Sequence, residues 1–510
     1  MRGAGVAESG GDRPGQGEAR LLASGALVQQ IAQAGGLVSL LVIVTVLARR
    51  LSVAELGAYG LVASLAGSLL VLRNSVASSA VRAMAAATEP GERARMFSAA
   101  AALYAVVGIA TGLLIAGVGV VISVAILDGQ LARDARTGAL GLGLVVAVGI
   151  AASVYLDALR AERRFVQAAA TEIAAVALFL TGMLVLILAG AGLGPVIAAS
   201  GVLPLLSGTL SGIGVKRRML PFWLTRAGVT RRRVMAIVPT AGHLLVIELS
   251  TLAMYGLQRI ILGAFTSART LGLYEGPLRA HNLFYALGGA LAVPVVPTAA
   301  TYVAADDAYR MRELVLRGTR YTLALVVPLC VTLMALAEPI LEVWLGERYG
   351  AGAPALTIIV SYWLLYGGLV VTPGFLVGAG AARYVARVFV LVAVLNLALS
   401  LALTPALGIE GPALATVIPF LLAFPVLLGL GLRVSGGVEL AALVRRAGLP
   451  AYALGSVLAA ALVALRLAAE PATLPAVLGA AVAGVLAYWL AFYLLVLERD
   501  ERALVRGLLS

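Results

Sequence analysis

The sequence predicts an all-α polytopic membrane protein, with about fourteen transmembrane helices in two parallel six-helix lobes plus two C-terminal helices. The first observation is composition: 61% of the 510 residues are hydrophobic and 12% are charged, too few charges to cover a soluble protein of this length. The second is that apolar runs of roughly 18 or more residues recur along the chain, each able to cross ~30 Å of hydrocarbon. The third is a weak internal repeat.

Apolar windows separated by arginine clusters and by short links with Gly or Pro divide the chain into spans. The expected spans are 21–48, 57–80, 98–126, 138–157, 168–190, 194–215, 234–263, 273–298, 319–345, 354–378, 384–405, 410–432, 448–467 and 474–497. No link between them exceeds about twenty residues, so we expect no soluble domain.

The distribution of positive charge predicts the orientation, because cytoplasmic loops of membrane proteins concentrate Arg and Lys. With the N-terminus inside, the inside segments hold 28 of the 38 Lys and Arg residues and the outside segments hold 7. We therefore expect both termini in the cytoplasm of a bacterial plasma membrane. The same asymmetry explains the formal net charge of +13 without nucleic acid as a partner.

The internal repeat predicts the domain organisation. Three short matches recur in the same order at offsets of 215 to 219 residues: 56–59 with 271–274, 164–166 with 383–385, and 194–195 with 411–412. Six helices per repeat keep both halves in one orientation, so the lobes should be related by an axis along the membrane normal. The expected parts are a cytoplasmic tail (1–20), an N-terminal lobe (21–215), a basic cytoplasmic link (216–233), a C-terminal lobe (234–432) and an addition with helices 13 and 14 and the C-tail (433–510).

Motifs for catalysis are absent from the sequence. It contains no GxxxxGK[ST] phosphate loop, and it has two histidines and a single cysteine, Cys330. Neither an ATP site, a zinc-hydrolase site nor a cysteine metal cluster is therefore expected. We predict no enzymatic activity, no cofactor and no metal.

Several segments resemble one family. Ala-Glu-Leu-Gly-Ala-Tyr-Gly at 54–60, Ile-Leu-Glu-Val-Trp-Leu-Gly at 340–346 and Gly-Ile-Glu-Gly-Pro-Ala-Leu-Ala-Thr at 408–416 are similar to segments of bacterial polysaccharide flippases. These flippases belong to the multidrug/oligosaccharidyl-lipid/polysaccharide exporter superfamily. The resemblance covers nearly the whole chain after the N-tail. It implies export of undecaprenyl-pyrophosphate-linked glycans to the outer leaflet. An acidic residue often found near Gln258-Arg259 in the family is absent here, so the resemblance assigns no coupling ion.

Polar residues of the expected seventh helix share one face. Glu248, Thr251, Tyr255 and Arg259 follow one another at increments of 3, 4 and 4, which places them on one side of an α-helix. A charge near mid-membrane costs ~2.5–3.5 kcal/mol on insertion scales, so such residues usually face a cavity or a partner. One interpretation is an inter-lobe lining, in which Arg259 and Tyr255 contact the pyrophosphate-sugar head and Glu248 binds a proton or cation. The other is helix–helix contact, with Arg259 extending to the nearby surface.

The eighth and second helices carry further candidates. Glu275 and Arg279 are four residues apart and can pair on one helix face; alternatively, Arg279, His281 and Asn282 contact the polar head group. On the second helix a face of serines ends at Arg82, near the expected cytoplasmic mouth. That face either lines the cavity, with Arg82 binding substrate, or serves close helix packing.

The function expected from these features is translocation of a polyprenyl-pyrophosphate-linked oligosaccharide for polysaccharide or lipopolysaccharide biosynthesis, by alternating access between the lobes. The expected partners are this lipid-linked glycan, the bilayer and polysaccharide-assembly enzymes, and the chain is expected to act as a monomer. One alternative is a cation-coupled multidrug antiporter, which needs a carboxylate-centred cation site. Another is a membrane glycan polymerase or ligase, which typically carries a sizeable outside loop.

Overall fold

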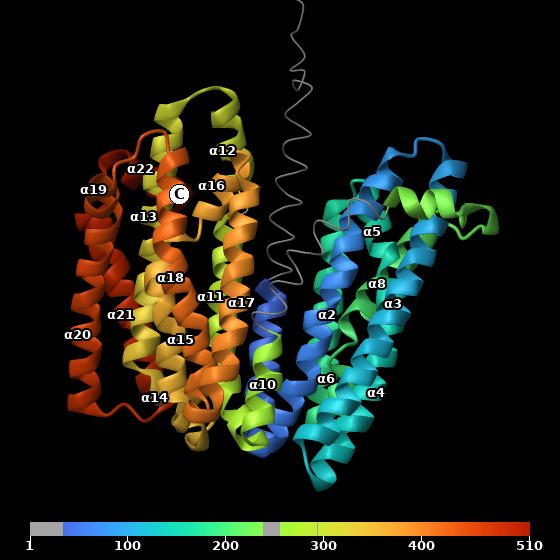
Figure 1. The fold of residues 1–510 in the computed structure, drawn as a ribbon, viewed down its shortest axis with the longest axis horizontal. Coiled ribbons are helices and arrows are strands. Elements are labelled where there is room, and N and C mark those ends of the chain that lie inside the picture. The colour runs from blue at the N-terminus through green and yellow to red at the C-terminus, as the bar shows by residue number, and fades with distance from the viewer. Residues whose placement is uncertain (1–33, 238–255, 293, 510) are drawn as a thin grey trace, which may run out of the picture.

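The computed structural model describes residues 34–237, 256–292 and 294–509. These residues are almost entirely helical, and no β-strand occurs among them. The structure confirms the predicted all-α fold class of two helical lobes with additional C-terminal helices (Figure 1).

The N-terminal lobe begins with a helix whose described part covers residues 34–50. A capping box fixes the start of the next helix, because Ser52 Oγ accepts from the Glu55 backbone N–H and the Glu55 carboxylate accepts from the Ser52 backbone N–H. The lobe continues with α2 (Val53–Ala86), α3 (Pro90–Ile126), α4 (Gly129–Ala152), α5 (Val154–Ala161), α6 (Phe165–Leu188), α7 (Leu193–Ala199) and α8 (Leu203–Arg217).

The link after α8 contains a short 3-10 turn, η1 (Arg226–Gly228), and residues 231–237 are helical again. The basic link expected at 216–233 is therefore helical at both of its ends. The C-terminal lobe comprises α10 (Leu257–Phe265), α11 (Ala268–Ala292), α12 (Val295–Ala304), α13 (Ala308–Ala335), α14 (Ala337–Leu345), η2 (Glu347–Gly352), α15 (Ala353–Tyr366), η3 (Gly367–Leu369), α16 (Thr372–Gly378), α17 (Ala382–Leu407) and α18 (Glu410–Val434).

The C-terminal addition consists of α19 (Leu440–Leu443), η4 (Val444–Gly448), α20 (Leu449–Ala469), α21 (Leu474–Leu495) and α22 (Arg499–Leu509). Both long helices pack against α13: Leu458 of α20 and Tyr488 of α21 belong to one buried apolar cluster with Leu323. Trp489 of α21 also donates to the Ala324 carbonyl at 3.0 Å. Helix α22 is tied back to the same helix, since Arg320 of α13 pairs with the buried carboxylate of Glu501.

The number of membrane spans is compatible with the prediction. Eleven helices of the described residues are long and apolar enough to span a membrane, and the pair α7 and α8, bent by 45°, makes a twelfth if counted as one. The two remaining expected spans, 21–48 and 234–263, extend into 1–33 and 238–255, outside the described residues. The count of fourteen therefore stays a prediction.

The two lobes stand side by side and diverge toward one end (Figure 1). At this end lie the links between α2 and α3, α5 and α6, α12 and α13, and α16 and α17, together with the C-terminus. We call it the basic end, because its links and the helix ends beside them carry most of the arginines. The opposite end, called the far end, is where the lobes approach each other, around α10 and the first turns of α2.

Candidate functional site

The lobes meet where α2 crosses α11, and glycines set the distance between them. A Cβ added to Gly272 of α11 would lie 1.9 Å from the Val53 carbonyl oxygen of α2, and one added to Gly57 would lie 2.1 Å from the Ala268 carbonyl oxygen. Only glycine permits backbones to approach this closely.

This crossing is reciprocal. Gly57 and Gly272 are 215 positions apart, and so are their contact partners Val53 and Ala268. Both glycines belong to the Leu-Gly-x-Tyr motif by which the sequence predicted an internal duplication. The repeated motif therefore packs against its own copy at the boundary between the lobes.

A buried cluster of three charged side chains lies beside the crossing. Glu275 of α11 accepts from Arg259 of α10 at 2.7 and 3.2 Å and pairs with Arg279 at 3.1 Å. Glu275 is 2% exposed and Arg259 is 6% exposed. The carboxylate also touches the other lobe: a Cβ added to Gly60 of α2 would lie 2.0 Å from Glu275 Oε1.

The cluster carries a surplus of positive charge, because two guanidinium groups share one carboxylate. The Nε atom of Arg279 is buried and has no hydrogen-bond partner among the described residues. Burying charge in an apolar region is costly unless each charge is paired. An incompletely neutralised pair of arginines at a lobe boundary is therefore suited to attract an anion.

Neutral polar side chains next to Arg259 anchor α10 to the C-terminal lobe. Gln258 donates to Thr416 Oγ1 of α18 at 2.6 Å, and Asn396 of α17 donates to the Ala415 carbonyl at 3.0 Å. Gln258, Thr416 and Asn396 are each 1% exposed. This network fixes the helix that presents Arg259 against the C-terminal lobe.

The structure brings some of the predicted site residues together and leaves others apart. Arg259 and Arg279 meet at Glu275, which confirms the expected Glu275–Arg279 pair and shows Arg259 buried in helix–helix contact rather than extended to the surface. Asn282 lies three residues further along α11 and is partly buried. Arg82 is exposed near the basic end of α2 and bonds Ser79 Oγ at 3.3 Å, roughly 30 Å along the helix from Gly60.

Four further residues complete this comparison. Glu248, Thr251 and Tyr255 lie outside the described residues. His281 is buried within an aromatic group, with its ring 5.6 Å from that of Tyr362 and 5.9 Å from that of Trp363. It is therefore a packed core residue in this conformation.

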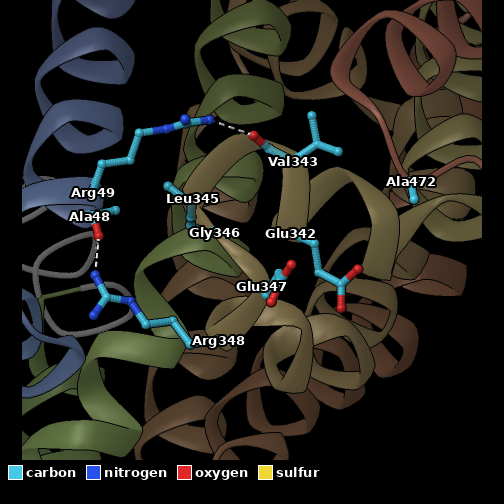
Figure 2. Close-up of a pocket in the computed structure, with 9 residues that line it drawn as sticks. All are labelled: Ala48, Arg49, Glu342, Val343, Leu345, Gly346, Glu347, Arg348 and Ala472. Carbon is cyan, nitrogen blue, oxygen red and sulfur yellow. Dashed lines mark hydrogen bonds between the residues drawn. The ribbon is translucent and has the colours of Figure 1, made fainter.

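A second polar region joins the lobes at the far end, around a cavity of about 630 Å³ (Figure 2). Arg49, at the end of the 34–50 helix, donates to the Val343 carbonyl of α14 at 2.8 Å. Arg348 of η2 donates in return to the carbonyls of Ala48 at 2.6 Å and Leu51 at 2.7 Å. Each arginine thus satisfies carbonyl groups at the C-terminal end of a helix in the other lobe.

A third charged group lies wholly within the N-terminal lobe. The buried Asp157 accepts from Arg73 at 2.6 Å, from the Tyr104 hydroxyl at 2.6 Å and from Arg160 at 2.9 Å. Glu172 of α6 also accepts from Arg160, at 3.0 Å, so two carboxylates balance two arginines here, whereas the inter-lobe cluster has one carboxylate for its two arginines. Within the described ranges, no group of three or more His, Cys, Asp or Glu side chains could hold a metal ion.

Comparison with known proteins identifies the fold. Residues 46–354, more than half of the chain, match the family model described as "Polysaccharide biosynthesis protein". The structure is similar to that of lipid II flippase MurJ in an inward closed conformation, with 14% identity over 92% of this chain and 99% of that chain and a TM-score of 0.69.

The structure is also similar to an inward-facing multidrug resistance MATE family transporter of the MOP superfamily, with 14% identity over 78% of this chain and 94% of that chain and a TM-score of 0.68. For an outward-facing MATE family transporter the identity is 16%, over 81% of this chain and 95% of that chain, and the TM-score is 0.53. The described conformation is thus more similar to the inward-facing structure. A sequence search among curated proteins finds no match.

Proposed function

Since the chain belongs to the polysaccharide biosynthesis protein family, we propose that it is a flippase for a polyprenyl-pyrophosphate-linked oligosaccharide. It moves this lipid across the bacterial plasma membrane by alternating access between its two lobes. The observation that supports the proposal is the buried Arg259–Glu275–Arg279 cluster at the lobe boundary. Arginine is suited to bind phosphate oxygens because its planar fork donates two parallel hydrogen bonds.

The orientation of the carrier follows from its charges. Most of the arginines lie on the links and helix ends at the basic end, where the lobes diverge (Figure 1), and the rule for membrane proteins assigns such segments to the cytoplasm. With that end in the cytoplasm, the lobes of this conformation diverge toward the cytoplasm. The greater similarity to an inward-facing than to an outward-facing transporter supports this assignment.

The cluster favours a flippase over a cation-coupled drug antiporter. An antiporter of this kind needs a carboxylate that is available to a proton or cation. Glu275 instead accepts from two arginines, which leaves the cluster cationic. A cationic cluster attracts a pyrophosphate and repels the cationic compounds that a cation-coupled drug site would hold.

Transport in reconstituted vesicles tests the proposal. Wild-type protein should move a fluorescent polyprenyl-pyrophosphate-linked oligosaccharide between leaflets, and Arg259→Lys should slow this at least about tenfold, because lysine keeps the charge but loses the planar fork. Arg269→Lys is the matched control, since Arg269 is exposed at the start of α11. Failure of the wild-type protein to move the lipid, combined with proton-driven export of a cationic dye, would replace the flippase with the antiporter.

A further inference from the structure

We propose that Glu275 is a resident anion whose place on Arg259 and Arg279 is taken by the substrate's pyrophosphate, and that this exchange releases the N-terminal lobe. The inference rests on the proposed function and adds to it how substrate binding is coupled to movement of the lobes. It assigns to Glu275 a positioning role, since the arginines, not the carboxylate, contact the substrate.

The first argument is that the arginines need an anion at all times. Arg259 and Glu275 are buried and the Arg279 side chain is 11% exposed, so the two guanidinium groups would repel each other strongly if the carboxylate were absent. A carboxylate and a phosphate present similarly spaced oxygens to an arginine fork. In the empty carrier, Glu275 therefore holds Arg259 and Arg279 in the arrangement that a pyrophosphate would require.

The second argument is that the cluster is incompletely satisfied. Glu275 brings one negative charge to two positive ones, and the buried Nε–H of Arg279 has no acceptor in the described part of the chain. A pyrophosphate brings more negative charge and more acceptor oxygens than one carboxylate. It can thus displace Glu275, whose carboxylate is at the end of a flexible side chain.

The third argument is that Glu275 contacts both lobes. Its Oε1 occupies the space next to the Gly60 backbone of α2, where an added Cβ would lie only 2.0 Å from that oxygen. When the carboxylate leaves the arginines, it also leaves this position against α2. A ligand that replaces Glu275 therefore alters the contact between the lobes. A ligand can drive a conformational change only if it interacts differently with the two conformations, and the loss of this contact provides that difference.

Two variants test the exchange from opposite sides. Glu275→Gln removes the competing charge, and Gly60→Ala pushes the carboxylate away, since the three atoms nearest to the added Cβ all belong to Glu275. Gly67→Ala on the same helix is the matched control, because a Cβ there would meet no atom within 4 Å. Binding of farnesyl pyrophosphate, and separately of inorganic pyrophosphate, is measured on purified protein in nanodiscs.

We expect Glu275→Gln and Gly60→Ala to bind farnesyl pyrophosphate about tenfold more tightly than wild type, within the usual range of coupling between sites, and Gly67→Ala to bind as wild type does. Tighter binding of inorganic pyrophosphate in the same two variants would show that the pyrophosphate group, which both ligands share, displaces Glu275, and that the lipid chain does not. If neither variant binds either ligand more tightly, while Arg259→Lys weakens binding of farnesyl pyrophosphate, the exchange is wrong and the flippase stands. If Arg259→Lys leaves binding unchanged as well, the arginine site itself is wrong.

A distance measurement tests the coupling to the lobes. Spin labels are placed at Thr88 and Ala305, which are exposed at the basic end of different lobes, after the buried Cys330 has been changed to serine. Farnesyl pyrophosphate should shorten the distance in wild type, and Gly60→Ala should shorten it without ligand. If Gly60→Ala binds farnesyl pyrophosphate more tightly but keeps the wild-type distance, Glu275 competes for the arginines without controlling the lobes. This result would overturn the second half of the proposal.

Discussion

Two corners of the far end occupy equivalent places in the duplicated fold but are built from different interactions. At one corner, Gly263 of α10 packs against α3, where an added Cβ would lie 2.8 Å from Ile126 Cγ2. At the other, the 34–50 helix meets α14 through Arg49 and the Val343 carbonyl. The positions correspond, since Ala48 and Gly263 are 215 apart and Ile126 and Val343 are 217 apart. We call them the apolar corner and the polar corner.

The difference indicates where the far end opens. The apolar corner depends on close shape complementarity, and separating it leaves a void or exposes hydrocarbon. The polar corner depends on arginine donors and carbonyl acceptors, and water can replace both partners after separation. It also borders the cavity of about 630 Å³. We therefore expect the lobes to part first at the polar corner and to hinge about the apolar one.

The largest effect is expected at the α2–α11 crossing between the two corners. Gly272→Ala places a Cβ 1.9 Å from the Val53 carbonyl oxygen, and no side-chain rotation relieves a clash with backbone. Overpacking of this kind typically costs about 1–3 kcal/mol, enough to shift the carrier toward a far-end-open state. The Thr88–Ala305 distance should shorten. Gly289→Ala, whose Cβ would meet no atom within 4 Å, should keep the wild-type distance; a shortened distance in both would refute the assignment to the crossing.

An intermediate effect is expected from the polar corner. The double variant Arg49→Ala/Arg348→Ala removes three hydrogen bonds to carbonyls of the opposite lobe. At about 0.5–1.5 kcal/mol for each bond, and less for exposed groups, the far-end-open population should rise roughly tenfold. The same spin-label pair measures it, with the adjacent exposed Arg50→Ala as control. An unchanged population would mean that the apolar corner and the crossing alone hold the far end closed.

The smallest effect is expected from one bond within the polar corner. Trp344 Nε1 donates to Thr45 Oγ1 at 2.7 Å, and Trp344→Phe removes that donor while keeping most of the ring. We expect a loss of about 0.5–1 kcal/mol, seen as a small decrease in the melting temperature in detergent. Thr45→Val should cost a similar amount, and the double variant should cost little more than either one. Additive losses would show that the two side chains act independently.

Much of the fold could be predicted from the sequence, because hydrophobic length and loop charge report directly on the membrane. The Leu-Gly-x-Tyr repeat predicted two related lobes, and its glycines lie at the crossing. The Glu275–Arg279 pair was predictable from its spacing along one helix. The Arg259–Glu275 pair was not, because it joins two helices whose relative rotation depends on the whole lobe. The same limitation applied to the polar corner, where arginines bind backbone carbonyls that leave no signal in a sequence.

The duplication has a consequence for the position of Glu275 itself. Gly60 and Glu275 are also 215 positions apart, so they are equivalent residues of the two halves, and they touch. Equivalent residues touch at a pseudo-twofold axis. A dimer of identical chains would have to place glycine against glycine or glutamate against glutamate there, leaving either a gap or two carboxylates in one space. Joining both halves in one polypeptide removed that constraint, so that a single acidic side chain could occupy the symmetry axis of the carrier.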